Sequence, residues 1–346
     1  MCRLRSLLLV LLLLARVGIA ADTTGLYDET MTVTARDDKA RAEDIRRALT
    51  EVLGRVIAPE DVQAKPAAAL LAHATDYVDQ YEYRSGETAE GRTVGGRLEV
   101  RFDRERVDQA LARAGIAVWG DKRPELLVWL TVMDGATSRF IGAEDGGALT
   151  AALQQAATRR RLPVILPLLD LTDQANLNAA DLDAVNLGRI RGAVWRYETD
   201  VALIGTLIPA GDFQWESRWR FVGPGQTAEW TLEALGSEAA LNAAVDAAYS
   251  RLVRLYAPTG RGATTLEIRV EGIGSMSEGE ICGNYLRGLP AVVRAEWAGA
   301  DATAVSWRLQ IRGSAQSFHQ MLADSRGLRP ASSPGSGGGE VYRWAP

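Results

Sequence analysis

The sequence contains few of the residues that enzymes use for metal binding and nucleophilic catalysis. Only two cysteines and two histidines occur among its 346 residues. His73 and His319 lie in different predicted modules, so no Ser-His-Asp or Cys-His arrangement can be recognised. Zinc sites need several cysteine or histidine ligands at close spacing, and that pattern is missing too. These absences argue against most common hydrolase and transferase classes.

Motifs for nucleotides, calcium and sugar hydrolysis are also missing. No Walker loop is present, and Gly272-Ile273-Gly274 is not followed by the rest of a dinucleotide fingerprint. A calcium loop starting at Asp170 would lack the glycine at its sixth position. Many acids are available, but nothing fixes two of them beside a cleft. The sequence therefore predicts no catalytic residues, no cofactor and no metal site.

No stretch after the N-terminal leader is apolar over transmembrane length, and residues 1–20 are predicted to be a signal peptide. Two arginines precede a leucine-rich run, and Gly18-Ile19-Ala20 is typical of cleavage after Ala20. The run is too short to span a bilayer comfortably. Cys2 precedes the leucines and is not in a lipobox position. We therefore expect a periplasmic protein without a lipid anchor or a transmembrane segment after processing.

Removal of the signal peptide changes the charge and the cysteine count. The remaining chain has 36 basic and 44 acidic residues, a net charge of −8, which disfavours nucleic acid as a partner. Cys282 is then the only cysteine, so no intrachain disulfide can form. Its main interpretation is a buried small hydrophobe, and the alternative is a reactive or intermolecular thiol.

The longest near-continuous apolar run after the leader, Arg123 to Met133, organises the rest of the chain. Pro124 pushes the residue before it toward extended geometry, and a run rich in Val and Leu without alternation indicates a strand buried on both faces. A second run, Leu162 to Asp170, includes a strand expected over residues 164–169. A helical pattern over residues 147–161 lies between the runs. Together they predict a parallel βαβ unit.

The predicted fold is α/β and α+β in three small modules, the central one a mixed sheet with this βαβ unit and an antiparallel meander. The expected divisions after the leader are 21–119, an N-terminal α+β module; 120–257, a central α/β mixed-sheet module; 264–325, a C-terminal βαββα module; and 326–346, a flexible tail. Alternation from Phe213 to Phe221 and from Ala228 to Leu232 predicts two meander strands, each with one buried face.

Further elements follow from helical periodicity, caps and alternation. The predicted helices are 38–56 capped by Asp37 or Asp38, 62–75, 104–115 capped by Asp103, a short helix capped by Asn178, and 237–256; the predicted strands are 77–83, 94–102, 201–208, 266–270, 292–297 and 305–311. A polar loop is expected after Met133. The nine tryptophans are interpreted mainly as core residues, with a ligand-stacking surface as the alternative.

Arg159, Arg160 and Arg161 end the predicted helix over residues 147–161. Cations are stabilised at a helix C-terminus by the macrodipole, which is the main interpretation. On that basis we expect Arg160→Ala to cost under about 1 kcal/mol of stability. Contact with an acidic partner surface or with lipid headgroups is the alternative.

Several short segments resemble the exported proteobacterial family called domain of unknown function 2066. They are Leu26-Tyr27, Ala48 to Leu53, Trp119-Gly120, Arg123-Pro124, Leu127-Val128-Trp129, Arg161 to Val164 and Leu166 to Asp170. The resemblance covers residues 21 to about 328 and is clearest in the first two modules. The central module is more distantly similar to envelope-assembly α/β domains, such as the N-terminal domain of the translocation protein TolB and the curli secretion lipoprotein. The family has no assigned activity, so the resemblance implies no catalytic residues.

We therefore expect a non-catalytic periplasmic protein, an adaptor or assembly factor that binds other envelope proteins. The alternative is a periplasmic enzyme or small-ligand binder acting on a cell-wall or sugar substrate. Acids or amides converging at the C-terminal ends of the strands that contain Val128 and Val164 would favour this alternative. A flat surface of mixed charge there would favour the adaptor.

Overall fold

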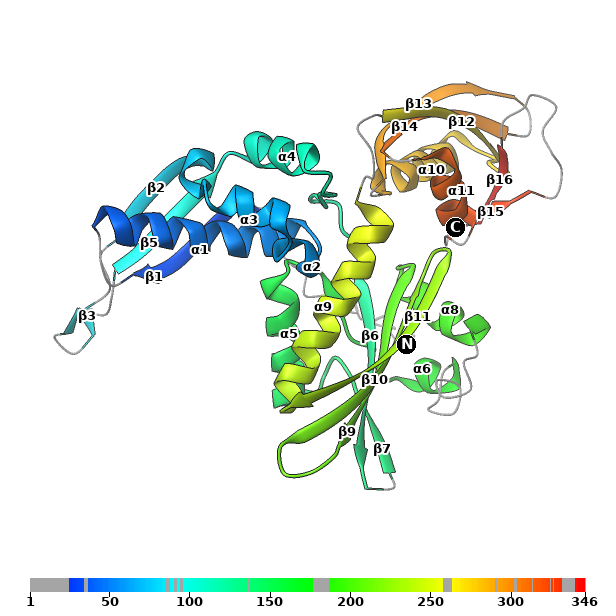
Figure 1. Ribbon diagram of the computed structural model, residues 1–346. Helices are drawn as coiled ribbons and strands as arrows, with labels where there is room; N and C mark the ends of the chain where they lie inside the picture. The colour runs from blue at the N-terminus through cyan, green and yellow to red at the C-terminus, as the bar shows by residue number, and fades with distance from the viewer. Residues whose placement is uncertain are drawn as a thin grey trace, which may run out of the picture.

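The computed structural model describes residues 25–345 with short gaps. The gaps are residues 34–36, 85–87, 90–91, 94–95, 136, 177–186, 258–262, 290, 302–303, 313, 324, 326 and 332–339. The chain has mixed α/β structure and forms three modules, each built on its own sheet. The N-terminal and C-terminal modules lie on either side above one end of the central module (Figure 1).

The N-terminal module packs its helices against a three-stranded antiparallel sheet in the order β1-β5-β2. Its elements are β1 (Asp28–Val33), α1 (Asp38–Val56), α2 (Pro59–Val62), α3 (Lys65–Leu71), η1 (Ala74–Tyr77), β2 (Val78–Arg84), β3 (Thr88–Ala89), β4 (Arg92–Thr93), β5 (Gly96–Phe102) and α4 (Arg104–Arg113). The side chains of Asp37 and Asp103 cap α1 and α4, as predicted. The single helix predicted for residues 62–75 is wrong. Pro66, in the first turn of α3, disfavours helix before it and divides the segment.

The central module has a six-stranded mixed sheet in which β6 occupies a middle position. The order is β11-β10-β9-β6-β7, with the short β8 pairing with β6. Its elements are β6 (Leu126–Asp134), β7 (Thr137–Ile141), α5 (Ala148–Arg159), β8 (Val164–Ile165), α6 (Leu171–Asn176), α8 (Leu187–Arg196), β9 (Val201–Pro209), β10 (Gln214–Gly223), β11 (Gln226–Leu235) and α9 (Ser237–Tyr256). Strands β8 and β9 run parallel to β6, and β9, β10 and β11 form the predicted meander.

Burial on both faces explains the apolar run in β6. Leu126, Val128 and Leu130 belong to the core beneath α5 and α9, whereas Leu127 and Trp129 belong to a second core with α8. All five side chains are completely buried. The strand predicted from residues 123–133 is therefore confirmed, and it is the central strand of the module.

Two expectations around β6 are wrong. The segment after Met133 is not only a loop, because β7 pairs with β6 as an antiparallel hairpin. The strand expected over residues 164–169 ends at Ile165, since Pro167 has no N–H for a strand ladder and Leu169 has a positive φ of 56°. Asp170 caps α6 by accepting from the backbone N–H groups of Thr172 and Asp173. The helix start predicted at Asn178 lies outside the described residues.

The C-terminal module has a five-stranded sheet in the order β13-β14-β12-β16-β15. Its elements are β12 (Ala263–Glu271), α10 (Met276–Gly288), β13 (Val292–Ala300), β14 (Ala304–Arg312), α11 (Ala315–Ala323), β15 (Leu328–Pro330) and β16 (Glu340–Trp344). The expectation of a flexible tail over residues 326–346 is wrong for β15 and β16. The apolar side chains of Leu328, Tyr342 and Trp344 are buried, and β16 pairs in parallel with β12. Within the described part of the chain, no helix is long and apolar enough to cross a membrane.

Candidate functional site

The two histidines and Cys282, which were considered for catalysis from the sequence, form no common site. His73 is exposed next to Asp76, whereas His319 contacts Glu340 and Tyr342 in the C-terminal module. Cys282 is completely buried in α10, and this burial raises the pKa of its thiol to about 12, so the thiol is protonated at neutral pH. Among the residues that the structure describes, no three His, Cys, Asp or Glu side chains are grouped to hold a metal ion.

Acids do converge just after β8, but their oxygens already have protein partners. Asp173, whose side chain is 1% exposed, accepts from the Tyr197 hydroxyl and the Leu169 N–H and pairs with Arg196. Asp170 caps α6 and pairs with Arg196 at 2.6 Å, which lowers the pKa of its carboxyl group. Burial and the hydrogen bond to Asp173 raise the pKa of Tyr197. These contacts hold the turn between β8 and α6, so they support a structural role.

The arginine triplet that ends α5 contacts this chain's own residues. Arg159 pairs with Asp246 on α9 at 3.1 Å. Arg160 is buried: it pairs with the same carboxylate at 2.8 Å and donates to the Gly54 carbonyl at 2.7 Å. Arg160 does end α5, as its C-cap residue, but stabilisation by the helix macrodipole is not its only role. Its guanidinium reaches the end of a different helix, in the N-terminal module.

The C-terminal end of α1 is held by side chains of the central module. Arg160 donates to the Gly54 carbonyl, whereas Arg123, at 2.5 Å, and the Tyr249 hydroxyl donate to the Arg55 carbonyl. These are among the last carbonyls of the helix, where α1 lacks internal partners and where positive charge is favoured. We call Gly54, Arg55, Arg123, Arg160 and Tyr249 the α1 joint.

Aromatic rings reinforce the α1 joint. The ring centroid of Trp119 lies 5.3 Å from that of Tyr249 and 6.2 Å from that of Tyr256, on which it stacks. The Arg123 guanidinium lies 4.7 Å from the centroid of the Trp119 ring. Burial lowers the pKa of Arg123 and raises that of Tyr249. Trp119 thus joins the two modules, since its backbone N–H also donates to the Val56 carbonyl of α1 at 2.7 Å.

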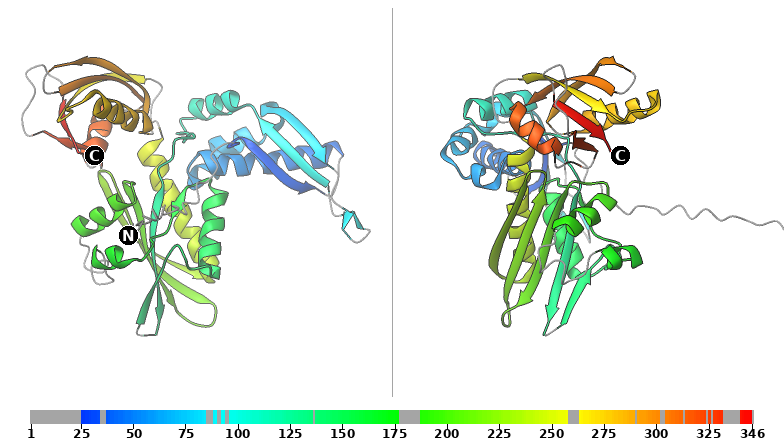
Figure 2. Two further views of the ribbon diagram at one scale, coloured as in Figure 1. Left: turned by 180° about the vertical axis from the view of Figure 1, so that it is seen from behind. Right: turned by 90° about the vertical axis from the view of Figure 1, so that its right-hand side faces the viewer.

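The central sheet has a groove on one face. Helices α5 and α9 cover the opposite face, and α6 and α8 lie beside β6 on the same side as the groove (Figure 2). Away from these helices lies a groove of about 840 Å³. Its lining comes from β6, β9, β10 and β11: Met133, Gly135, Ile204, Thr206, Ile208, Arg218, Trp219, Arg220, Glu229, Trp230 and Thr231. We call these residues the open side of the central sheet.

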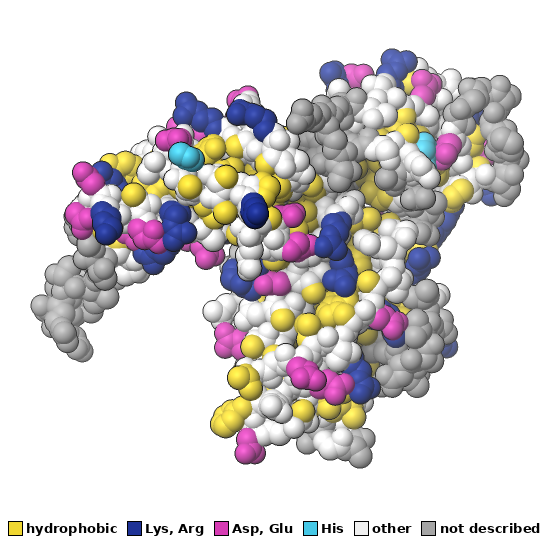
Figure 3. All heavy atoms as spheres, in the orientation of Figure 1, with side chains coloured by type: hydrophobic (Ala, Val, Ile, Leu, Met, Phe, Trp, Pro, Cys, Tyr) yellow, Lys and Arg dark blue, Asp and Glu magenta, His cyan; other side chains and the backbone are white. Residues whose placement is uncertain are grey.

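The open side combines an apolar floor with paired charges. Ile204 and Ile208 lie on β9, while Arg220 pairs with Glu229 at 2.7 Å and Arg218 pairs with Glu216 at 2.9 Å. On the face of the molecule seen in Figure 3, charged side chains of both signs lie among one another. Paired charges on a shallow apolar sheet suit an extended peptide or a protein surface more than proton transfer.

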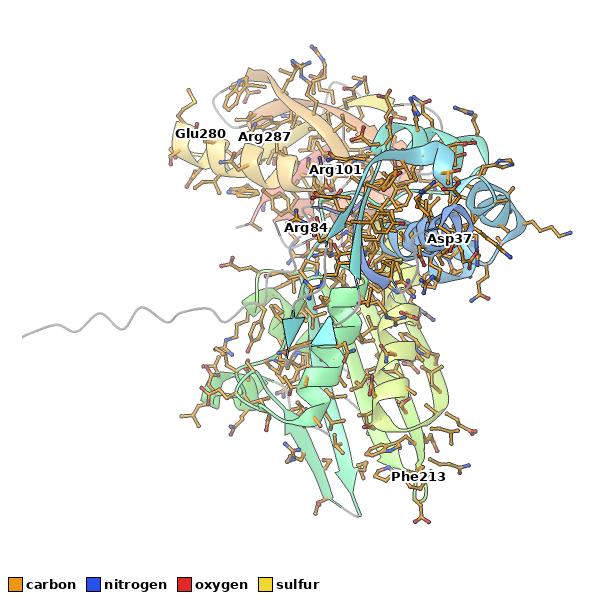
Figure 4. The ribbon with its side chains drawn as sticks, turned by 90° about the vertical axis from the view of Figure 1, so that its left-hand side faces the viewer. Asp37, Arg84, Arg101, Phe213, Glu280 and Arg287 are labelled. Atoms are coloured by element: carbon orange, nitrogen blue, oxygen red, sulfur yellow. The ribbon has the colours of Figure 1, made fainter. Side chains whose placement is uncertain are left out.

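An apolar tip extends the open side at the end farthest from the other modules. Phe213 and Leu235 are 77% and 76% exposed, next to a hollow of about 350 Å³ lined in part by Trp215. Phe213 lies at the far end of the central module, away from Arg101 and Arg287 of the other two modules (Figure 4). The alternation placed Phe213 on the buried meander face, which is wrong because it precedes the first residue of β10.

Sequence reasoning did not single out the open side or the tip. The alternation of Thr227, Glu229, Thr231 and Glu233 with apolar residues was visible, but it does not show which strand lies at a sheet edge. The tryptophans are mostly core residues, as expected: Trp119, Trp129, Trp219, Trp307 and Trp344 are buried, whereas Trp297 is 43% exposed.

Comparison with known proteins gives a match to an uncharacterised family over the first module. Residues 20–120 match a family model described as a domain of unknown function, DUF8605. This match covers the N-terminal module and ends at the Trp119-Gly120 link to the central one. No curated protein matches the chain significantly. The match assigns no role to any residue, so the functional inference rests on the geometry.

Proposed function

We propose that this protein is a non-catalytic adaptor or assembly factor that binds other cell-envelope proteins through the open side of the central sheet. The observation that carries the proposal is a sheet face with a groove, an edge strand that no other described strand covers, and an exposed apolar tip. Exposed apolar surface of this kind is typical of interaction sites. Two acids beside it, Glu216 and Glu229, are paired with arginines, which argues against their use in general acid-base catalysis.

The periplasmic assignment belongs to the same proposal. It is supported by the charged, apolar and small-residue segments of residues 1–20. We expect mass spectrometry of the periplasmic fraction to find a chain beginning at Ala21. Recovery of the full-length chain from the cytosol would contradict export, with a known periplasmic and a known cytosolic protein as fractionation controls.

A finer family assignment is also proposed. The segments that resemble domain of unknown function 2066 include Trp119-Gly120 of the α1 joint region and Leu127-Val128-Trp129 of β6. The likeness of the central module to TolB-type envelope-assembly domains rests on the order of parallel unit, meander and long helix. That likeness supports a related architecture and, only by analogy, an assembly role.

One observation favours the alternative of a sugar or cell-wall ligand. The groove of about 840 Å³ lies toward the C-terminal ends of the parallel strands β6 and β9, where α/β proteins often bind ligands. Its threonines and arginines could hydrogen-bond hydroxyl or carboxylate groups. Binding of defined cell-wall glycans, measured by calorimetry on the mature protein, tests this alternative directly.

Site-directed photo-crosslinking in intact cells tests the adaptor proposal. Cys282 is buried and is the only cysteine after the expected processing, so an introduced cysteine can be labelled selectively. We expect a crosslinker on Thr206→Cys, in the groove, to capture envelope proteins that one on Gln109→Cys, exposed on α4, does not. Equal capture from both positions, or turnover of a glycan by the purified protein, would contradict the proposal.

A further inference from the structure

Strand β11 is the edge of the central sheet. It is ten residues long and pairs with β10 throughout, and no strand among the described residues pairs with its other side. An unpaired edge of this length presents a row of backbone N–H and C=O groups to solvent. We propose, as a refinement of the function proposed above, that β11 binds one extended segment of a partner protein by strand addition, and that this segment alternates basic with apolar residues.

The hairpin geometry defines which backbone groups are available. Residues Pro224 and Gly225 form a two-residue turn, so Gly223 and Gln226 make the first hydrogen-bonded pair. Hydrogen-bonded and non-hydrogen-bonded pairs then alternate along the ladder. The residues whose backbone groups point away from β10 are therefore Thr227, Glu229, Thr231 and Glu233. A partner strand can hydrogen-bond to all four without disturbing the sheet.

The same four residues determine the charge of the partner. Their side chains are exposed on the face that carries the groove, and two of them are glutamates. Glu229 already pairs with Arg220, but a basic side chain directly across from Glu229 or Glu233 would add a favourable cross-strand pair. An acidic segment would place like charges opposite each other.

The other face of the edge requires apolar side chains. Trp230, Leu232 and Ala234 are half-buried against the core beneath α9. Arg251 of α9 lies 3.9 Å above the Trp230 ring, and Ala243 and Ala247 precede it on the same side of the helix. These two alanines are half-buried and have small apolar side chains, so the residues of an added strand that face α9 would bury apolar surface.

A second copy of this chain suits the edge poorly. If two β11 strands paired in antiparallel fashion about Trp230 or Thr231, glutamates 229 and 233 of both copies would gather on one face. In such registers they lie directly or diagonally opposite one another, which is destabilising. Glutamates beside an exposed edge are also a common device against self-association. A partner strand with basic residues places opposite charges across from Glu229 and Glu233, whereas a second copy places like charges there.

The opposite edge of the sheet is a less suitable acceptor. Strand β7 has only five residues, and its first three side chains are exposed. Strand β11 offers twice that length, an apolar side and an acidic side. The proposal is therefore specific to one edge and can be tested against the other.

Peptide binding to the mature protein tests strand addition. The probe is a labelled peptide of about nine residues that alternates lysine with valine, and the control is its glutamate-valine counterpart. Anisotropy should show binding of the lysine peptide alone, and hydrogen exchange should slow at the amides of Thr227, Glu229, Thr231 and Glu233. Charge reversal in Glu229→Lys/Glu233→Lys should weaken binding by about tenfold. Glu105→Lys, exposed on α4 in the N-terminal module, should leave it unchanged.

Thr231→Pro separates strand addition from simple charge attraction. Its missing N–H points away from β10, so the variant should fold with an unchanged melting temperature yet lose peptide binding. Binding without amide protection, or undiminished binding to a folded Thr231→Pro variant, would overturn strand addition. Sedimentation showing a dimer that this variant abolishes would assign the edge to a second copy and also overturn the inference. If strand addition is overturned but the crosslinker on Thr206→Cys still captures envelope proteins, the proposed adaptor function stands. If this capture is absent as well, both the adaptor function and strand addition are contradicted.

Discussion

The α1 joint and the open side of the central sheet use the same residue types in opposite settings. In the joint, Arg160 is 10% exposed and bonds to a backbone carbonyl of another module as well as to Asp246. On the open side, Arg218 is 67% exposed, and its ion pair among the described residues is with a neighbour two residues away, Glu216. An arginine that is hydrogen-bonded to a backbone carbonyl of a separate module has a structural role. An exposed arginine that pairs with a near neighbour in sequence can still contact a partner protein.

This contrast separates the residues that stabilise the protein from those that are available for binding. The C-terminal module is also attached to the central module. Their cores are continuous, and Lys122 donates a hydrogen bond to the Arg287 carbonyl at 2.7 Å. Both outer modules thus have defined attachments at one end of the central sheet. The opposite end, where Phe213 lies, has neither module nearby (Figure 4). Substitutions at the two ends should therefore affect different measurements.

The largest expected loss of stability is at β6. Trp129 is completely buried, and its ring lies 6.0 Å from that of Phe140. Trp129→Ala should cost about 3–5 kcal/mol, because it leaves a large cavity on the side covered by α8. Denaturant unfolding measures this cost. Trp297→Ala, at a position 43% exposed, is the control and should cost clearly less; equal costs would contradict the assignment of β6 as the central strand.

The next effect concerns Arg160 in the α1 joint. Arg160→Met keeps most of the aliphatic stem but leaves the Gly54 carbonyl without this donor, so we expect a loss of about 1.5–3 kcal/mol. X-ray scattering should also show a wider range of orientations of the N-terminal module. Arg159→Met, at a side chain 42% exposed, should cost under about 1 kcal/mol. Melting curves that do not distinguish the two variants would show that the joint is not rigid.

A smaller, pH-dependent effect is expected at Cys282. Burial raises the pKa of its thiol from 9.0 to about 12, so above pH 9 the unfolded chain releases this proton and the folded chain retains it. Stability from this group is therefore fully present below pH 9 and falls as the pH rises toward 12. The advantage of the wild type over Cys282→Ala should shrink by about 1 kcal/mol between pH 8 and pH 10. A constant difference across that range would mean that the thiol is accessible in the folded state.

Much of this architecture could be predicted from periodicity and caps, because those signals are local. Helix α1 has the predicted bounds, and α9 begins and ends at the expected residues, Ser237 and Tyr256. Segments with a weak local pattern were missed: β7 is short and largely exposed, and β16 follows a Gly/Ser-rich stretch but buries Tyr342 and Trp344 against distant parts of the chain. Long-range pairing of this kind leaves little trace in a single sequence.

The candidate site was harder to predict than the fold, because its residues are brought together by tertiary structure. Arg160 looked like an ordinary helix-end residue, and only the position of Gly54 in another module shows why it is buried. The edge position of β11 follows from strand order, which alternation does not reveal. The exposure of the tip could not be predicted from alternation either. The meander pattern continues through Phe213, although α9 does not cover this residue.

The smallest expected effect on stability, and a large one on binding, is at the tip. Phe213 and Leu235 are more than three-quarters exposed, so Phe213→Ser/Leu235→Ser should change the free energy of unfolding by no more than about 0.5 kcal/mol. If the tip contacts a partner, loss of these side chains should sharply reduce capture by a crosslinker on Thr206→Cys, because apolar anchors contribute much of the energy of protein interfaces. Leu171→Ser is the matched control, since Leu171 is 83% exposed on α6. A folded double variant that still captures partners as the control does would limit the binding surface to the groove and the β11 edge.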